Sequence, residues 1–341
     1  MNEMTTPKEK LTIKDFTSDQ EVRWCPGCGD YAILKCMQRT LPEMVATREN
    51  TVFVSGIGCS SRFPYYMDTY GFHTIHGRAP AIATGIKLAK PELDVWVITG
   101  DGDGLSIGGN HLVHAIRRDV DLNILLFNNQ IYGLTKGQYS PTSVIGTKTP
   151  STPQGSVDPT LNPIAFALGS GARFVARTVD TAQKHMPDVF KRAHAFKGAS
   201  FVEILQNCIV YNDAIWEEIT NKKTAPDNQL LLEHGEPMIF GAEHNKGIIF
   251  NTVNFALEVV TVGENGISEA DILVHDETNL QMARMLADLG EKPGEPAPMG
   301  VIYASEADHC YVDAVRGQMD AEKGKRSLKD IIHSGQTWVV E

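Results

Sequence analysis

Residues Asp94–Asn129 read DVWVITGDGDGLSIGGNHLVHAIRRDVDLNILLFNN, and this stretch decides the fold. It contains two apolar runs, Asp94–Thr99 and Leu122–Asn128, and each has the length and β-branched content of a buried strand. A helical pattern covers about 108–118, between the two runs. A strand, a helix and a second strand in this order predict a parallel pair joined by a right-handed crossover.

The same alternation extends in both directions from this unit. Further strands are predicted at Thr51–Ile57, Ala172–Thr178 and Phe201–Gln206. Further helices are predicted at about 29–45, 79–90, 161–169 and 181–197. We therefore expect an α/β fold with a mostly parallel central sheet flanked by helices. Ligands in such folds bind beyond the carboxyl ends of the strands.

The pattern divides the chain into three parts. Residues 1–20 are polar and are expected to form an N-terminal arm, while 21–215 carry the strand–helix alternation. The pattern weakens afterwards, so 216–341 are predicted to be a C-terminal extension that wraps the first domain or contacts another subunit. A Ser-, Thr- and Pro-rich stretch at Ser140–Pro163 is expected to be a functional or disordered loop.

Composition excludes several classes of protein. The 31 Lys and Arg residues against 42 Asp and Glu give a net charge of −11, which argues against a general nucleic-acid binder. No apolar run approaches the ~20 residues that cross a bilayer, and the N-terminus has no signal-peptide pattern. A cytoplasmic protein is therefore expected. Six cysteines in a reducing compartment favour ligands, catalytic thiols or core residues over disulfides.

Polar clusters directly follow the two central strands. Gly100-Asp101-Gly102 comes after the first strand and Asn128-Asn129 after the second. Asp101 offers an anionic oxygen and Asn129 a neutral one, and Mg²⁺ binds such oxygens together with substrate phosphates. The two glycines allow the backbone to approach a phosphate closely. Two unrelated turns could give the same letters, but the pair at this spacing favours a diphosphate–magnesium site.

This pair resembles the binding signature of thiamine diphosphate (TPP) enzymes. The resemblance implies a TPP-binding fold in which Asp101, Asn129 and the backbone carbonyl of Ile131 hold Mg²⁺ on the diphosphate. It also implies that Gly102 and Asp103 shape the loop around the cofactor.

Four cysteines form a second candidate site. Cys25 and Cys28 make a Cys-x-x-Cys motif, and Cys59 and Cys208 each follow a predicted strand. The first two alone fit a redox pair, half of a zinc site or unliganded core cysteines. However, no strand precedes them as a thioredoxin-like motif requires, and no second close pair completes a zinc site. Four thiolates suffice for a [4Fe–4S] cluster. The other two cysteines are expected to be structural: Cys36 and Cys310.

Five motifs make the resemblance more specific: Trp24–Asp30 (WCPGCGD), Gly56–Ser61 (GIGCSS), His76–Ala79 (HGRA), Gly100–Asn110 (GDGDGLSIGGN) and Asn128–Gln138 (NNQIYGLTKGQ). Together they resemble the β subunit of 2-oxoacid:ferredoxin oxidoreductases, and most of all its 2-oxoglutarate type. The likeness continues to Ile272–Glu277 (ILVHDE) and Thr337–Val339 (TWV). One departure is Ile209 after Cys208, where other members usually have proline.

The resemblance implies TPP-dependent oxidative decarboxylation of 2-oxoglutarate with coenzyme A to succinyl-CoA and CO₂. Electrons would pass through the [4Fe–4S] cluster to ferredoxin, and the reaction could also run in reverse. The implied cluster ligands are Cys25, Cys28, Cys59 and Cys208. The implied cofactor contacts are Cys59, Ser60, His76, Gly77, Arg78, Gly100, Asp101, Gly102, Asp103, Asn129, Ile131, Gly133 and Leu134.

Three side chains are implied in catalysis. His76 would form a hydrogen bond to TPP or polarise the substrate carbonyl. Alternatively, His76-Gly77-Arg78 could be an ordinary helix-capping turn. Arg62 and Lys136 match positions near the substrate carboxylates, where an arginine can pair bidentately with a carboxylate. Both could instead be solvated surface charges.

The resemblance also implies partners. No glutamate stands in a recognisable context for activating the aminopyrimidine ring of TPP, so we expect that residue on an α subunit, in an αβ heterodimer or its dimer. This chain alone should then be inactive. Docking of an acidic ferredoxin would need a local basic patch. Candidates are 191–197, Lys222-Lys223 and 323–329.

Three other functions stay open. A pyruvate-specific or broad 2-oxoacid:ferredoxin oxidoreductase would share every motif. A non-oxidative TPP enzyme, such as a decarboxylase or an acetolactate-type synthase, would explain Asp101 and Asn129 but not the four cysteines. The third alternative is a protein without enzymatic activity, in which a TPP fold only holds an iron–sulfur cluster or zinc.

Overall fold

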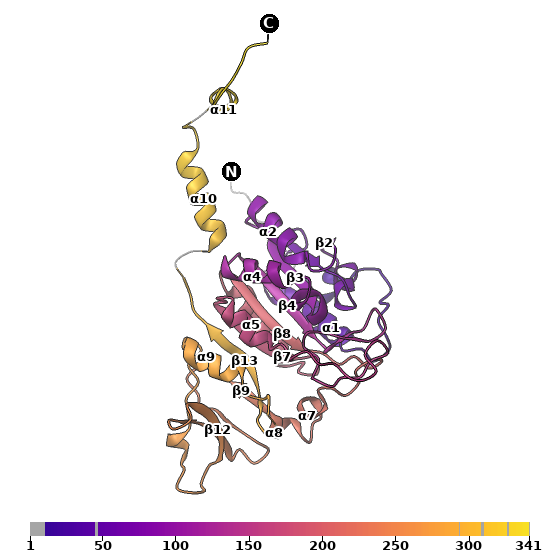
Figure 1. The fold of residues 1–341 in the computed structure, drawn as a ribbon, viewed down its shortest axis with the longest axis vertical. Coiled ribbons are helices and arrows are strands. Elements are labelled where there is room, and N and C mark those ends of the chain that lie inside the picture. Colours follow the sequence, from indigo (N-terminus) through magenta and orange to yellow (C-terminus); the bar gives the residue numbers. More distant parts are fainter. Residues whose placement is uncertain (1–10, 45–46, 293, 308–309, 326, 341) are drawn as a thin grey trace, which may run out of the picture.

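A computed structural model describes residues 11–44, 47–292, 294–307, 310–325 and 327–340. Its centre is an eight-stranded sheet with the strand order β2-β1-β3-β4-β8-β7-β13-β9 (Figure 1). These strands are β1 (Thr51–Ser55), β2 (Tyr70–His73), β3 (Asp94–Gly100), β4 (Leu122–Asn128), β7 (Phe174–Val179), β8 (Ala199–Leu205), β9 (Gln229–Leu232) and β13 (Ala297–Ala304).

The predicted mostly parallel sheet is confirmed. Every neighbouring pair from β2 to β7 is parallel, whereas β13 runs antiparallel to β7 and β9 parallel to β13. Because these parallel strands share one direction, the segments that follow β1, β3, β4 and β8 all leave from the same edge of the sheet. This edge carries the candidate site.

Two hydrophobic cores lie on opposite faces of the sheet. In β3, Val95 and Val97 belong to one core, while Trp96 and Ile98 belong to the other, as the period of two in a strand requires. The first core is covered by α2 (Ala79–Ala89), α4 (Gly109–Arg117), α5 (Pro163–Gly169) and α9 (Leu280–Ala287). The second is covered by α1 (Asp30–Thr40), α6 (Met186–Ala195) and the 3₁₀-helix η3 (Ser60–Tyr66).

Short elements complete the fold. The 3₁₀-helices are η1 (Ile13–Phe16), η2 (Leu41–Glu43) and η4 (Glu269–Asp271). The remaining short helices are α3 (Asp101–Leu105), α7 (Glu217–Thr220) and α8 (Ala225–Asn228). A two-stranded hairpin consists of β5 (Ile131–Tyr132) and β6 (Gln138–Tyr139).

Part of the predicted N-terminal arm is packed against the body. Phe16 in η1 is fully buried, and its carbonyl accepts a hydrogen bond from the backbone N–H of Asp68 at 3.0 Å. The first ten residues of that arm lie outside the described residues.

The predicted extension, 216–341, contributes strands β9 and β13, so the central sheet continues across the predicted boundary at 215. It also forms a small antiparallel sheet of β10 (Ile239–Phe240), β11 (Lys246–Asn251) and β12 (Ala256–Thr261). Helices α10 (Tyr311–Glu322) and α11 (Leu328–Ile332) project from the body as an arm (Figure 1). In the described part of the chain, none of the helices has both the length and the apolar character needed to cross a bilayer.

Candidate active site

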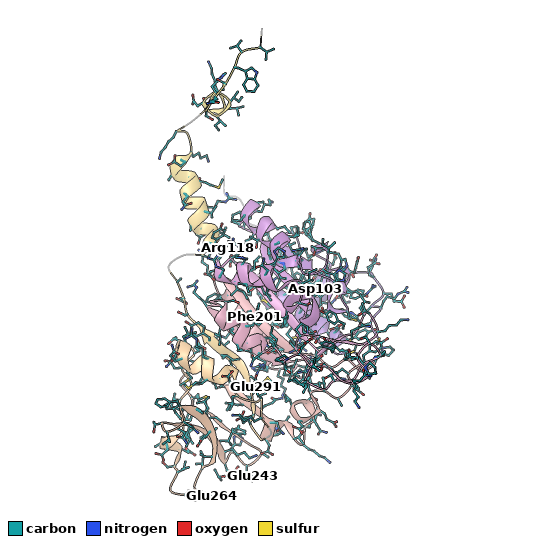
Figure 2. The ribbon with its side chains drawn as sticks, in the orientation of Figure 1. Asp103, Arg118, Phe201, Glu243, Glu264 and Glu291 are labelled. Atoms are coloured by element: carbon teal, nitrogen blue, oxygen red, sulfur yellow. The ribbon has the colours of Figure 1, made fainter. Side chains whose placement is uncertain are left out.

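A cavity of about 380 Å³ opens at the carboxyl edge of β1, β3 and β4. All of the predicted cofactor contacts except Gly77 and Arg78 line it. Asp103, which lines the cavity, lies in the body of the protein, well separated from Glu243 and Glu264 in the small-sheet region (Figure 2). The fold therefore brings residues from four separate sequence motifs into one site.

Asp101 begins α3 directly after β3 and is only 2% exposed. Its Oδ2 atom accepts hydrogen bonds from the hydroxyls of Ser140 at 2.6 Å and Thr142 at 2.7 Å. Burial raises the pKa of Asp101 to about 6, although these two hydroxyls oppose the shift. A nearby cation would stabilise the ionised form of this buried carboxylate. The environment of Asp101 therefore fits a role as a magnesium ligand.

Asn129 and Ile131 follow β4 and face the same cavity. The Nδ2 atom of Asn129 donates to Gln206 Oε1 at 2.7 Å, and its Oδ1 atom accepts from the backbone N–H of Ile131 at 3.2 Å. Gln130 between them has φ 55°, which turns the chain sharply. One carboxylate, one amide oxygen and one backbone carbonyl form the oxygen set that Mg²⁺ prefers.

Asp103 holds the neighbouring loops in place. Its Oδ1 atom accepts from the backbone N–H groups of Ile57 at 3.1 Å and Gly77 at 2.7 Å, and its Oδ2 atom accepts from Thr99 at 2.7 Å. A Cβ atom on Gly56 would lie 1.9 Å from Asp103 Oδ2, so only glycine fits there. Asp103 therefore fixes the loops that carry Cys59 and His76.

His76 lines the cavity, whereas Gly77 and Arg78 do not. Gly77 has φ 67°, and a Cβ atom there would lie 2.4 Å from the backbone of Gly108. Arg78 contacts the Nε2 atom of His111. Gly77 and Arg78 therefore shape the loop rather than the cavity wall.

Tyr132 is a cavity residue that the sequence did not identify. Its hydroxyl donates to the carbonyl of Gly102 at 2.9 Å. A Cβ atom on Gly102 would lie 2.3 Å from the ring. The Tyr132 ring therefore leaves room only for glycine at position 102. The absence of a side chain there would also allow a phosphate to approach the backbone. Other lining residues that were not predicted are Ile57, Gly58, Ser106, Ile107, Phe127 and Thr135.

The stretch Ser140–Pro163 packs its first residues into the site. Ser140, Thr142 and Ser143 are buried, and Thr142 also donates to Asn128 Oδ1 at 3.0 Å. Asn128 Nδ2 in turn donates to Glu203, which pairs with Arg177 at 2.6 Å. A continuous polar network therefore runs from Asp101 into the protein interior.

The four candidate cysteines gather around Cys59, which lines the cavity while the other three do not. The Sγ atoms of Cys59 and Cys208 each lie 3.5 Å from the place that a Cβ atom on Gly133 would occupy. Cys59 is also an electrostatic neighbour of Cys25, Cys28 and Cys208. In contrast, Cys36 is buried in the core beside Thr40 and Cys310 caps α10.

Burial dominates the acidity of these thiols. It raises the pKa of Cys59 to about 12 and also raises that of Cys28, and the negative charge of Asp30 adds to both shifts. Thiolates grouped in such a place favour a positively charged metal centre. Gly133 leaves open the space between two of the sulfurs, so the arrangement fits a cluster.

The described residues contain no group of three His, Cys, Asp or Glu side chains that could hold a metal ion. The proposed magnesium site has only one such side chain, because its other ligands are an amide and a backbone carbonyl. The four thiolates of a [4Fe–4S] cluster bind separate iron atoms, so they need not converge on one point.

Arg62 and Lys136 do not line the cavity. The guanidinium of Arg62 lies over the rings of Tyr65 and Tyr66, and its Nε atom donates to the Tyr66 hydroxyl at 2.8 Å. Lys136 is exposed on the β5–β6 hairpin, next to Thr135, which does line the cavity. Contacts of these two side chains with substrate stay predictions.

Comparison with known proteins gives a consistent result. The family model "Thiamine pyrophosphate enzyme, C-terminal TPP binding domain" matches residues 56–204. The 2-oxoglutarate oxidoreductase subunit KorB of Mycobacterium tuberculosis is 49% identical over 335 residues, covering 96% of this chain and 88% of the relative. Subunit β of 2-oxoacid:ferredoxin oxidoreductase 1 from Aeropyrum pernix is 49% identical over 190 residues, 56% of this chain and 60% of its own length.

A solved structure is similar along nearly the whole chain. It is a 2-oxoglutarate:ferredoxin oxidoreductase from Magnetococcus marinus with 2-oxoglutarate, coenzyme A and succinyl-CoA bound. The TM-score is 0.74 at 32% identity, and the match covers 96% of this chain and 97% of the other.

Proposed function

This chain belongs to the β subunits of 2-oxoacid:ferredoxin oxidoreductases, and from that premise we propose that it acts on 2-oxoglutarate together with an α subunit. In the proposed reaction 2-oxoglutarate loses CO₂, coenzyme A receives the succinyl group, and two electrons pass through a [4Fe–4S] cluster to ferredoxin. The relative from Mycobacterium tuberculosis and the structure from Magnetococcus marinus, both named for 2-oxoglutarate, support this substrate.

The observation that carries the proposal is the position of Cys59. This cysteine lines the same cavity as Asp101 and Asn129, and it is also the electrostatic neighbour of the other three candidate cysteines. A cluster on these thiolates would form part of the cavity wall. Such proximity suits electron transfer from a substrate held in the cavity.

The residues of this chain have distinct proposed tasks. Bound TPP would supply the electron sink that makes loss of CO₂ from a 2-oxoacid easy. Asp101, Asn129 and the Ile131 carbonyl would hold the diphosphate through Mg²⁺, and His76 would donate a hydrogen bond into the cavity. Phe127 and Ile131, both buried, give the cavity an apolar wall that limits water.

An α subunit would cover the mouth of this cavity. Ile107 and Leu134 line the cavity yet are 57% and 54% exposed. The neighbouring edge strand β2 is exposed along its whole length, including Tyr70 and Phe72, and leads to the exposed Ile75 just before His76. Exposed apolar patches and open sheet edges of this kind are typical of subunit interfaces. The partner would also bring the carboxylate that activates TPP.

The test is to purify the complex of this chain with its α subunit without oxygen. We expect four iron atoms and one TPP per β chain, and reduction of ferredoxin that requires both 2-oxoglutarate and coenzyme A. Absence of iron together with bound TPP would instead support a non-oxidative TPP enzyme. Iron without TPP would support a scaffold.

The second candidate is a broad 2-oxoacid specificity. The relative from Aeropyrum pernix, named for 2-oxoacids in general, reaches the same 49% identity over its shorter match. Equal kcat/KM values for pyruvate and 2-oxoglutarate would favour this alternative.

A further inference from the structure

Gln206 lies between the two proposed cofactor sites. It directly follows β8 and is 1% exposed. Its Oε1 atom accepts a hydrogen bond from Asn129 Nδ2 at 2.7 Å, and its Nε2 atom donates to Cys28 Sγ at 3.3 Å. One buried amide therefore touches a proposed magnesium ligand and a proposed cluster ligand.

We propose that Gln206 is a positioning residue that couples the diphosphate–magnesium site to the iron–sulfur cluster. This inference rests on the proposed function, because it needs both cofactors to be bound. It assigns two separate tasks to the two ends of the amide.

The first task is to orient Asn129. The Oε1 atom of Gln206 can only accept hydrogen bonds, so it fixes the amide nitrogen of Asn129 on its own side. The Oδ1 atom of Asn129, which accepts one hydrogen bond from the backbone N–H of Ile131, is thereby kept on the other side, where its second lone pair can bind a cation. Without this acceptor the Asn129 amide could rotate and present its N–H donors to the metal. Loss of an orienting partner typically weakens metal binding.

The second task is to stabilise negative charge on the Cys28 sulfur. The N–H dipole of Gln206 points at Sγ from within a buried region, where such an interaction is less screened. A reduced cluster carries one more negative charge than an oxidised cluster, so a donor to a ligating sulfur favours reduction. Hydrogen bonds to the sulfurs are among the factors that set cluster potentials.

Gln206 is itself held rigidly. Its backbone N–H donates to the Asn128 carbonyl at 2.9 Å, and its Nε2 atom also donates to the Asn207 carbonyl at 2.5 Å. That carbonyl accepts from the backbone N–H of Gly29 at 3.2 Å. The end of β8 thus ties the Asn128-Asn129 turn to the loop of Cys25 and Cys28, and the amide has little freedom to leave either partner.

The experiment compares two variants in the anaerobically purified complex. Gln206→Met removes both hydrogen bonds, whereas Gln206→Glu still accepts from Asn129 but cannot donate to Cys28 when ionised. The cluster potential is measured by a redox titration followed by electron paramagnetic resonance. The affinity for TPP with Mg²⁺ is measured by calorimetry on the oxidised complex, so neither readout depends on turnover.

We expect both variants to make the cluster harder to reduce. At a fixed solution potential, the ratio of reduced to oxidised cluster should fall about tenfold. For a one-electron couple this corresponds to a reduction potential lowered by about 59 mV. The affinity for TPP with Mg²⁺ should fall about 10- to 100-fold in Gln206→Met and stay near the wild-type value in Gln206→Glu. This split separates the two tasks.

The matched control is Gln183→Met. Gln183 also donates through its amide, to the carbonyls of Ala32 and Asp180, but it does not line the cofactor cavity. We expect neither the potential nor the affinity to change in this variant. An unchanged potential and affinity in Gln206→Met would overturn the proposal.

Two further outcomes are decisive. If Gln206→Met does not fold, Gln206→Glu decides: a lowered potential with retained affinity supports the coupling, and an unchanged potential overturns it. A wild-type complex that binds no iron and no TPP would overturn the proposed function and this inference with it. A wild-type complex that binds both, with Gln206 variants that behave like it, would overturn this inference alone.

Discussion

The Asp101 side of the site, which lines the cavity, and the cysteine side, of which only Cys59 lines it, are built differently. On one side, Asp101 and Asp103 receive hydrogen bonds from hydroxyls and backbone N–H groups of this chain. On the other side, beside Cys28, both carboxylate oxygens of Asp30 and one of Asp180 are buried without a nitrogen or oxygen hydrogen-bond partner among the described residues. Burial raises the pKa of Asp30 to about 7, and the Cys28 thiol offsets this only in part.

The two sites therefore depend on their ligands to different degrees. The Asp101 side is ordered by its own polar network before any cofactor binds. The cysteine side collects thiols and carboxylates whose ionised forms disfavour one another, and buried groups without partners cost stability. We therefore expect a bound cluster to stabilise the fold on the cysteine side, whereas magnesium would enter a site that this chain's own residues already form.

The largest expected effect comes from removing Cys59, which belongs to both sides. In Cys59→Ala the iron content and the ferredoxin-linked turnover should both fall to background, because a four-cysteine cluster loses a ligand. Iron analysis of the anaerobic complex checks this. Similar losses are expected for alanine variants of Cys25, Cys28 and Cys208, while Cys36→Ala and Cys310→Ala serve as controls. Full iron in Cys208→Ala would point to Cys36 as the fourth ligand.

The second-largest effect is expected from a substitution of Asp101, on the magnesium side of the site. Asp101→Asn removes the anionic magnesium ligand, so TPP affinity should fall by at least the ~100-fold that loss of an outer partner can cost. Iron content should stay normal, because the cysteines lie on other loops. Calorimetry with TPP and Mg²⁺ and an iron assay on the same sample check both halves. Normal TPP binding would show that the site has been misassigned.

The residues most accessible to sequence analysis are those that follow buried strands. Asp101 and Asn129 come directly after apolar runs, so their meeting at one sheet edge could be predicted. Ser140, Thr142 and Gln206 could not, because their partners lie 39, 14 and 77 residues away in the chain. Nothing local distinguishes such a serine, threonine or glutamine from others nearby. Their roles depend on packing.

The strands of the fold also differ in how well local sequence patterns predict them. Strands β3, β4 and β8 are buried on both faces, which gives the continuous apolar runs that predict them. Strand β2 has four exposed residues at the sheet edge and leaves no such run. Strand β13 runs antiparallel to β7, and this place in the sheet depends on a connection that local patterns do not encode.

A smaller effect tests whether the Asp101 side is ordered before magnesium arrives. Thr142→Val removes a hydroxyl that joins Asp101 to Asn128 at nearly constant volume. We expect about 10-fold weaker binding of TPP with Mg²⁺. Thr142→Ser keeps the hydroxyl and should restore most of the affinity. Equal losses in both variants would mean that the methyl group, not the hydrogen bond, matters.

Substrate selectivity gives the fourth test, on the hairpin between the two sides. Lys136→Met should lower kcat/KM for 2-oxoglutarate roughly 10-fold more than for pyruvate, the low end for loss of a charge-assisted bond because this lysine is exposed. Arg62→Met should discriminate less, since its guanidinium lies over Tyr65 and Tyr66. Equal losses for the two substrates in Lys136→Met would refute its part in choosing 2-oxoglutarate.

The smallest expected effect concerns electron delivery on the cysteine side. In the predicted basic segment 191–197, Lys191, Arg192 and Lys197 are already engaged by Glu43, Glu277 and Asp313. Lys222 and Lys223 are exposed and follow Thr220, which lines a hollow together with Cys28. They are thus better placed to attract an acidic ferredoxin to a protein of net charge −11.

The double variant Lys222→Glu/Lys223→Glu should therefore reduce ferredoxin several-fold more slowly at low ionic strength, and its rate should depend less on salt than that of the wild type. Lys323→Glu/Lys329→Glu changes the net charge equally but lies on the C-terminal arm that projects from the body (Figure 1). The rate of this control should fall with salt more steeply than that of Lys222→Glu/Lys223→Glu, because long-range repulsion rises equally in both variants and only local steering differs. If the rate of ferredoxin reduction by the wild type does not change with salt concentration, ferredoxin does not dock on a basic patch of this chain.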